Sequence, residues 1–250
     1  MQGTCPGANL LRWTLKYLIG SSTVQSSQAV WALVRKQHGV IAHHQLVAHG
    51  FSPRAIRRRI EKGRLHPIWR SVYAVGRPQL TEYGRWMAAV LACGPEAALS
   101  HATAAALWEI GPNSNGPIHI SIPAGFRPRH PGIVGHRRAS FTDDDVTRHR
   151  GIPVTTPVCT LIDLAARGTR HELESAINEA DKRDLVDPEA LRNALDEVAR
   201  RPGLGQLRQT LDRRTFTMTD TELERRFLPI APKTGLDKPR DAGLGERLPG

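Results

Sequence analysis

The spacing of apolar residues near the start of the chain predicts three short helices. A first helix begins near Ser27, ends at His38-Gly39 and carries one apolar face, made of Val30, Trp31, Leu33 and Val34. A second, shorter helix is expected over residues 43–49, where Leu46 and Val47 are its apolar positions. Gly50 and Phe51 then supply a turn to a third helix.

The third helix has both a defined start and a defined apolar face. Ser52 is a good N-cap, and Pro53 suits the first helical position. Ile56 and Ile60 lie four residues apart, so they share one face of the helix. Their spacing places Arg59 at the edge of that face and turns four basic residues away from it, namely Arg54, Arg57, Arg58 and Lys62. We therefore expect this helix to have a cationic outer surface.

A hairpin is expected after Gly63. Residues 64–66 and 71–75 are two runs of strand-forming residues on either side of residues 67–70, which we expect to form the turn. A helix-turn-helix followed by such a hairpin is the arrangement of a winged-helix domain. The hairpin would bring Arg64 and Arg70 to the same side as the third helix, with Arg77 as a further candidate.

Beyond this unit the pattern mixes helices and strands. Ile118, Ile120 and Ile122 alternate with His119 and Ser121, which predicts a half-buried strand. The other expected elements are strands over residues 133–136 and 152–154 and helices over residues 80–93, 100–110, 158–166, 170–182, 188–200 and 204–213. The expected fold class is therefore α+β: an N-terminal winged helix-turn-helix followed by a mixed domain of short strands and several helices.

We expect the chain to divide into four parts. Residues 1–26 mix small polar residues with one apolar piece broken by charge, which favours a poorly ordered extension over a secretory signal. Residues 27–78 are the expected winged helix, and residues 79–214 the expected α+β domain. Residues 215–250 begin with one more helix and continue as a Pro- and Gly-rich tail with no core pattern.

Two groups of residues contain side chains of the kind found in catalytic or metal sites, but their positions along a helix do not favour either role. Ser100 beside His101 could be a nucleophile and a base, but neighbouring helical residues do not face each other, so Ser100 is better explained as an N-cap. Residues 143–145 are three aspartates near His149. Consecutive carboxylates diverge around a helix axis and complement its dipole, so we expect no metal site there.

Charge indicates the kind of partner. The chain carries a formal net charge of +11, and between Arg54 and Arg77 its many basic residues face one acidic residue, Glu61. Such density favours a polyanionic partner, and double-stranded DNA is the first candidate. No stretch reaches the roughly 18 to 20 apolar residues of a membrane span, so no membrane partner is expected.

The cysteines bear on the cellular compartment. Cys5, Cys93 and Cys159 are far apart in the sequence and show no disulfide or metal-binding spacing. Such a pattern fits a reducing environment, and we therefore expect a cytoplasmic protein.

Several motifs together indicate a family. The segments are GRLHPIWRSVYAVG, ALSHATAAALWEI, PIHISIP and GIPVTTPVCTLIDLA. Over residues 27–228 the chain resembles actinobacterial proteins with an AbiEi-like antitoxin winged helix, in which a domain similar to very-short-patch-repair endonucleases usually follows. The resemblance implies a DNA-binding, antitoxin-like transcriptional regulator whose winged helix binds its own promoter.

The sequence departs from this family in the nuclease part. TELERRF resembles the first nuclease helix, with Glu222 or Glu224 at the family's early acidic position, but the Val-Asp-Phe and Glu-x-Asp-Gly motifs expected next do not occur. Cleavage of DNA by a Mg²⁺ enzyme needs carboxylates from several elements, so we expect no catalysis and no cofactor. We interpret residues 215–250 as the remnant of a truncated or frameshifted endonuclease-like domain. Cys159 also differs, because the family often has arginine there.

The leading prediction is thus sequence-specific DNA binding. Ser52 would orient the third helix; Arg54, Arg57 and Arg58 would reach base edges or phosphates; and Lys62, Arg64 and Arg70 would neutralise the DNA backbone. Two rival functions stay open. One is a Mg²⁺-dependent endonuclease, acting alone or completed by another chain. The other is a toxin-neutralising module that binds a cognate toxin through residues 158–213, and a second copy of the chain is also a possible partner.

Overall fold

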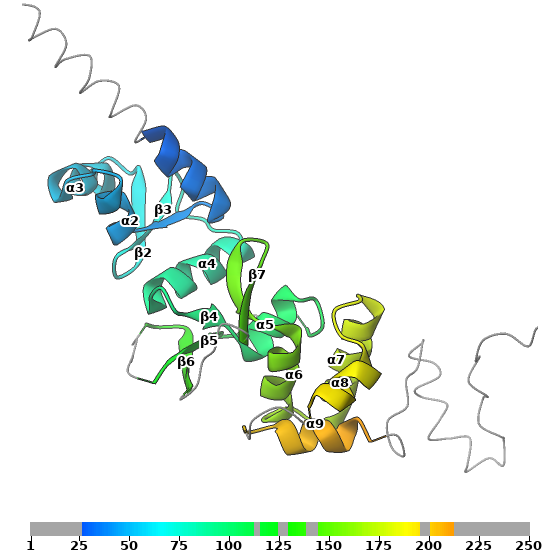
Figure 1. Cartoon of the computed structure of the whole chain (residues 1–250). Coiled ribbons are helices and arrows are strands. Elements are labelled where there is room, and N and C mark those ends of the chain that lie inside the picture. The colour runs from blue at the N-terminus through cyan, green and yellow to red at the C-terminus, as the bar shows by residue number, and fades with distance from the viewer. Residues whose placement is uncertain (1–26, 113–115, 125–129, 139–144, 196–200, 213–250) are drawn as a thin grey trace, which may run out of the picture.

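The computed structural model describes residues 27–112, 116–124, 130–138, 145–195 and 201–212 (Figure 1). Within them the chain forms two β-sheets and several short helices, which confirms the predicted α+β class. Figure 1 shows the N-terminal elements at one end, α4 beneath them, and the helices α6 to α9 at the other end. The expected extension over residues 1–26 and the expected nuclease remnant, including Glu222 and Glu224, lie outside the described residues.

The N-terminal unit contains the three predicted helices. A helix over residues 27–36 is followed by β1 (Val40–Ala42), α2 (His43–Ala48), α3 (Pro53–Glu61), β2 (Leu65–Trp69) and β3 (Val72–Val75). The strands form an antiparallel sheet in the order β1-β3-β2. Strand β1 was not predicted. The helices and strands enclose a small apolar core: Val30, Val34, Ile41, Leu46, Ile56, Leu65 and Tyr73.

The turn of the β2–β3 hairpin is shorter than the sequence predicted. Pro67 lies within β2 opposite Tyr73, and the pairing shifts between Pro67 and Trp69. Only Arg70 and Ser71 connect the strands, and Ser71 has a left-handed φ of 62°. The prediction that residues 67–70 form the turn is therefore wrong. Proline is tolerated here because β2 is an edge strand, where a missing N–H breaks no interior ladder.

The second sheet joins five strands in the order β6-β5-β4-β8-β7. The predicted strands are present as β5 (Ile118–Pro123), β6 (Ile133–Arg138) and β8 (Ile152–Thr155). Two strands were not predicted, namely β4 (Ala98–Leu99) and β7 (Val146–His149). Strand β4 has only 2 residues but lies at the centre of the sheet, antiparallel to β5 and parallel to β8. A periodicity of two cannot be recognised in so short a segment.

Helices cover this sheet and extend from it. Helix α4 (Glu82–Cys93) and α5 (His101–Leu107) are followed, after β8, by α6 (Pro157–Ala165), α7 (Arg170–Lys182), α8 (Pro188–Ala194) and α9 (Leu204–Thr210). Four of the starts are fixed by side-chain caps, on Thr81, Thr156, Thr169 and Asp187. The predicted start of the helix at residue 188 is confirmed, and Asp187 is its cap.

Gly203 allows α9 to approach α6 closely. Its φ is +88°, and a Cβ atom there would lie 2.2 Å from the Ile162 carbonyl oxygen. Only glycine satisfies both conditions without strain.

The N-terminal unit and the second sheet are packed together. Val40 and Val72 of the first sheet join the larger core around α4 and the second sheet. The ring of His38 is hydrogen-bonded to the carbonyl of Arg150 (2.8 Å), and Trp69 Nε1 donates to the carbonyl of Pro131 (3.2 Å). These contacts hold the two regions in one arrangement. In the described part of the chain, each helix is too short or too polar to span a membrane.

Candidate nucleic-acid interface and histidine cluster

Helix α3 begins as the sequence predicted. Ser52 is its N-cap, and the Ser52 Oγ accepts a hydrogen bond from the Ala55 N–H at 3.2 Å, with Pro53 at the first position. Ile56 is 2% exposed and Ile60 is half-buried, so these two side chains form the inner face of the helix. The predicted N-cap and the predicted apolar face are both confirmed.

The basic residues proposed for DNA binding are all exposed. They are Arg54, Arg57, Arg58, Lys62, Arg64 and Arg70. Within the described residues none of them forms an ion pair. The first turn of α3 contains no acidic residue but does contain Arg54, which the positive end of the helix dipole disfavours. The dipole favours Arg58, which lies in the last turn, so helix stability fails to account for Arg54 in particular.

Arg59 differs from its neighbours. It is half-buried, donates to the Ala55 carbonyl at 3.1 Å, and places its guanidinium carbon 4.4 Å from the centre of the Phe51 ring. It thus supports the turn before α3, as its predicted position at the edge of the apolar face suggested.

The hairpin carries the two other cations. The Arg64 N–H donates to the Arg59 carbonyl at 2.8 Å, so Arg64 directly follows the end of α3. Arg70 lies at the far end of β2, in the turn. The 5 residues of β2 therefore separate these two side chains along the edge of the sheet.

A second site lies in the other sheet, where three histidines from different elements meet. His101 begins α5, His119 lies on β5 and His136 on β6. The rings of His101 and His136 are stacked with centroids 3.6 Å apart, and His119 Nδ1 lies 2.9 Å from His136 Nε2. Of the three, only His101 was considered from the sequence, as a base beside Ser100, and that role was not favoured; His119 was expected on the polar side of its strand.

Arg138 and Asp163 connect this cluster to neighbouring elements through hydrogen bonds and an ion pair. Arg138 donates to Ser121 Oγ (2.9 Å), to Cys159 Sγ (3.1 Å) and to the carboxylate of Asp163. Asp163 is only 8% exposed and also lies 3.5 Å from His101 Nδ1. The network therefore connects β5, β6, α5 and α6.

A neighbouring pair extends the network. Arg201 donates to Asp145 at 2.7 Å and approaches Cys159 Sγ at 3.6 Å. Of the three consecutive aspartates at residues 143–145, the structure describes Asp145, which is paired with Arg201. Among the residues that the structure describes, no group of three or more His, Cys, Asp or Glu is arranged to hold a metal ion.

Ser100 does not cap α5 as predicted. It occupies the N-cap position but accepts no hydrogen bond from the helix; its Oγ lies 3.0 Å from His101 Nδ1 instead. The reason is that His101 has a left-handed φ of 52°, which turns its ring back toward Ser100. Both Ser100 and Asp163 face the same ring nitrogen, whereas a serine nucleophile and an orienting acid must contact opposite nitrogens of the base.

The histidines of the cluster are neutral near pH 7. Burial, followed by the charges of its neighbours, lowers the pKa of His101 from 6.5 to about 2. The same causes lower the pKa of His136 to about 4 and also lower the pKa of His119. Burial raises the pKa of Asp163 to about 6, although the Arg138 guanidinium lowers it. Near pH 7 Asp163 is therefore a carboxylate paired with Arg138.

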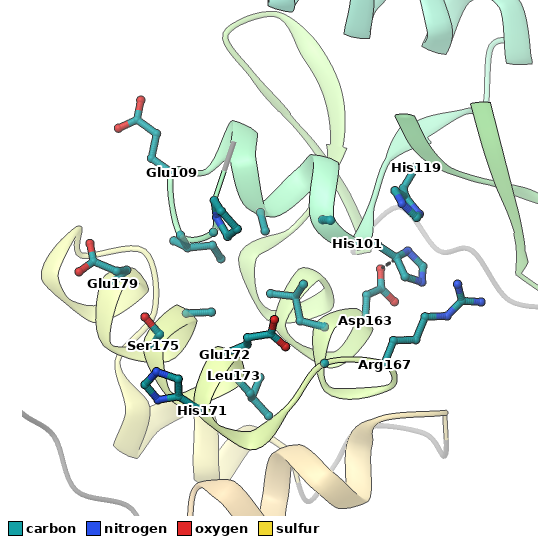
Figure 2. A pocket seen from close by; sticks show the side chains of 18 residues that line it. His101, Glu109, His119, Asp163, Arg167, His171, Glu172, Leu173, Ser175 and Glu179 are labelled. Atoms are coloured by element: carbon teal, nitrogen blue, oxygen red, sulfur yellow. Dashed lines mark ion pairs between the residues drawn. The ribbon is translucent and has the colours of Figure 1, made fainter. Parts of the chain in front are cut away.

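Two cavities lie beside the cluster. One, of about 600 Å³, runs between α5, α6 and α7, and the other, of about 740 Å³, lies between β6 and the start of α9. His101, Asp163 and Arg167 line both. Figure 2 shows these three residues, with His119, at one end of the first cavity, and Glu109 and Glu179 toward the other.

Comparisons with known proteins identify the family of the chain. No curated protein matches it. The crystal structure of the RV2827C protein from Mycobacterium tuberculosis is similar at 18% sequence identity and a TM-score of 0.45, covering 75% of this chain and 77% of that one. The family model for the AbiEi antitoxin C-terminal domain matches residues 29–213. Since this match spans most of the sequence, the chain belongs to the AbiEi antitoxin family.

Proposed function

We propose that residues 27–78 are a winged-helix DNA-binding domain and that the protein is an antitoxin-type transcriptional regulator acting on its own promoter. In this proposal α3 is the recognition helix and the β2–β3 hairpin is the wing. Residues 79–214 form the antitoxin-like domain that carries the winged helix. Membership of the AbiEi antitoxin family supports a regulator of this kind.

The observation that carries the proposal is the outer face of α3. Its arginines are exposed and lack a carboxylate partner within the described residues, while Ile56 on the opposite face is buried. Like charges this close repel one another, so the arrangement costs free energy in the isolated protein. A DNA backbone, with one negative charge per about 1.7 Å of helix axis, would offset that cost.

The proposed contacts differ along the surface. Arg54, Arg57 and Arg58 project from α3 and are placed to reach base edges or phosphates in the major groove. Arginine can bind guanine through two parallel hydrogen bonds, which gives sequence specificity. Beside these contacts, Lys62, Arg64 and Arg70 neutralise the DNA backbone. Ser52 orients the helix.

The test is the simultaneous replacement of Arg54, Arg57 and Arg58 by alanine. We expect specific binding to the promoter to be lost and the slope of log K against log salt to flatten by about 0.9 for each phosphate contact removed. Gel shifts and fluorescence anisotropy over a range of salt concentrations measure both. The fold should be retained, because none of the three side chains contributes to the apolar core.

A control variant separates specific contact from loss of charge. Arg148, Arg170 and Arg183 are exposed arginines of the second region, and replacing all three by alanine removes the same charge. This control should bind the promoter within about twofold of the wild type. Equal affinity and equal salt slope in the α3 variant and the wild type would rule out the winged-helix proposal.

A toxin is the second proposed partner, and the family description supports it, since the family is one of antitoxins. The helical segment over residues 158–213 is the proposed contact surface. Co-expression with the product of the neighbouring gene, followed by affinity purification in nuclease-treated buffer, tests this. Co-purification that survives the triple arginine replacement on α3 would assign toxin binding to a surface other than the DNA interface.

The endonuclease alternative depends on residues outside the described part of the chain. We expect purified protein to leave plasmid and mismatched DNA intact in Mg²⁺ or Mn²⁺, because the sequence lacks the clustered carboxylates that hold such ions. Nicking that disappears in Glu224→Ala would show instead that the endonuclease-like segment is functional.

A further inference from the structure

The histidine cluster contains more positive charge than its own pairs neutralise. Arg138 is paired with Asp163, and Arg201 with Asp145. Arg137 and Arg167 are exposed and line the cavities, and within the described residues neither has a carboxylate partner. The second cavity is therefore cationic. In the first cavity the positive charge is that of Arg167, and the carboxylates of Glu109, Asp163, Glu172 and Glu179 also line it.

Arg167 holds the central position. It lines both cavities, together with His101 and His119 in the first and with His101 and His136 in the second. Figure 2 shows its side chain extending along the same side of the pocket as His101 and Asp163. Neutral imidazoles next to an unpaired guanidinium offer N–H donors together with one full positive charge.

The remainder of the first cavity has a mainly apolar wall that also contains polar residues. The apolar residues come from α5, α6, α7 and the segment after α5: Ala102, Ala105, Ile110, Pro112, Leu164, Leu173 and Ala176. The polar residues are Glu109, His171, Glu172, Ser175 and Glu179. The volume of this cavity, about 600 Å³, falls in the range of small-molecule sites. One end thus suits an anion, and the body of the cavity suits a flat apolar group.

A purely structural role explains only part of the cluster. The contact between Arg138 and Asp163 ties β6 to α6 and needs no ligand. It does not explain why His101, a residue with a Cβ, adopts a left-handed φ where it lines both cavities. Strain of this kind, about 1 kcal/mol or more, is concentrated at binding and catalytic sites.

We propose that the two neighbouring cavities, which share His101, Asp163 and Arg167 in their walls, form a binding site for a nucleotide. Its phosphate is held by Arg167 and Arg137 and by the one N–H group that the hydrogen bond between His119 and His136 leaves available. Its base lies in the first cavity, between α5 and α7. The proposal concerns the second region and is independent of DNA binding by α3. The ligand is a free mononucleotide or the phosphorylated end of a nucleic acid, which present the same chemistry.

The experiment is calorimetric titration of the full chain with AMP, GMP, CMP and UMP, and with adenosine and inorganic phosphate as partial ligands. At least one mononucleotide should bind with 1:1 stoichiometry, and about tenfold more tightly than adenosine or phosphate alone, because both ends of the site contribute. No binding by any of the four at millimolar concentration would overturn the proposal.

Three variants locate the binding. Arg167→Ala should weaken nucleotide binding at least about tenfold, since it removes a charge-assisted contact. Arg148→Ala removes an exposed arginine outside both cavities and should leave the affinity within about twofold. Ala102→Leu fills part of the first cavity and should weaken the nucleotide but not inorganic phosphate. Equal effects of Arg167→Ala and Arg148→Ala would mean nonspecific attraction and would overturn the proposal.

The source of the ligand is decided by a further titration. A single-stranded octamer with a 5′-phosphate, compared with the same octamer without it, tests recognition of a chain end. Binding of the phosphorylated octamer with the affinity of the mononucleotide assigns the site to nucleic-acid ends, and weaker binding assigns it to free nucleotides. Arg167→Ala should retain promoter binding in gel shifts, so failure of this proposal and failure of the α3 proposal are distinguishable.

Discussion

On α3, Arg54, Arg57 and Arg58 are exposed and make no ion pair with any described residue. In the histidine cluster, the side chain of Arg138 is 13% exposed and donates to a hydroxyl, a thiol and a carboxylate. The first set can be removed without disturbing the fold, because water already solvates the guanidinium groups. The guanidinium of Arg138 binds protein groups in place of water. The environment and the function of Arg138 therefore depend on the stability of the whole sheet.

The largest change in stability is expected for a substitution in the buried histidine cluster. Asp163→Ala leaves the Arg138 guanidinium buried without its carboxylate and should reduce the free energy of unfolding by about 3 to 5 kcal/mol. Arg58→Ala, on the exposed side, should change it by less than about 0.5 kcal/mol. Urea unfolding followed by circular dichroism measures both, with Asp163→Asn as a control that keeps the shape of the side chain. A loss below 1 kcal/mol for Asp163→Ala, on the scale of a surface residue, would show that Arg138 reaches water easily.

Stability should also depend on pH through the histidine cluster. The folded-state pKa of His101, about 2, lies below its ordinary value of 6.5, so the unfolded chain takes up the proton first and stability falls as pH decreases below 6.5. Asp163 acts in the opposite direction, because its folded-state pKa is raised to about 6 from 3.8. The pKa values of all three histidines are lowered, so we expect their combined effect on stability to exceed that of Asp163.

The measurement is thermal unfolding at about pH 7.5 and about pH 5.5. His101 alone should account for a loss of about 1 kcal/mol over this interval. His101→Asn removes the titrating ring while tolerating the left-handed backbone, so this variant should show a smaller pH dependence. An unchanged pH dependence in His101→Asn would mean that His101 does not titrate between the two states as its burial implies.

The smallest expected effect compares two serines at helix starts. Ser52→Ala should cost about 1 kcal/mol, because Ser52 Oγ caps α3, and Ser52→Asp should restore the cap. Ser100 also stands at an N-cap position but makes no cap hydrogen bond and is fully buried next to His101. Ser100→Asp should therefore destabilise the protein by burying a second carboxylate near Asp163. Chemical unfolding of the four single variants, with Ser100→Ala as the fourth, checks this; restoration by aspartate at both positions would contradict it.

The structure agrees with the sequence most closely where the signals are local. The spacing of Ile56 and Ile60 and the pair Ser52-Pro53 lie within nine residues and define the start and the inner face of α3. The alternation of isoleucines in β5 was equally readable, because it depends on neighbours in one element. The proposed DNA-binding residues follow from this local pattern, and their role is the prediction that the α3 variants test.

Strands β4 and β7 and the turn at Arg70-Ser71 were missed because sheet pairing, not periodicity, defines them. The same holds for the histidine cluster. His101, His119, His136 and Asp163 come from four elements, and their meeting depends on the strand order β6-β5-β4-β8 and on the packing of α5 against α6.

The sequence by itself thus determined which face of α3 is basic and where that helix begins. It placed Ser100 and His101 side by side but could not reveal the left-handed φ that brings the two side chains into contact. Only the tertiary structure decided that three imidazoles, Arg138 and Asp163 share one buried site. The physical reason is that burial, unlike periodicity, is a property of elements packed together, and burial is what lowers the pKa of these histidines and forces their polar groups to bind one another.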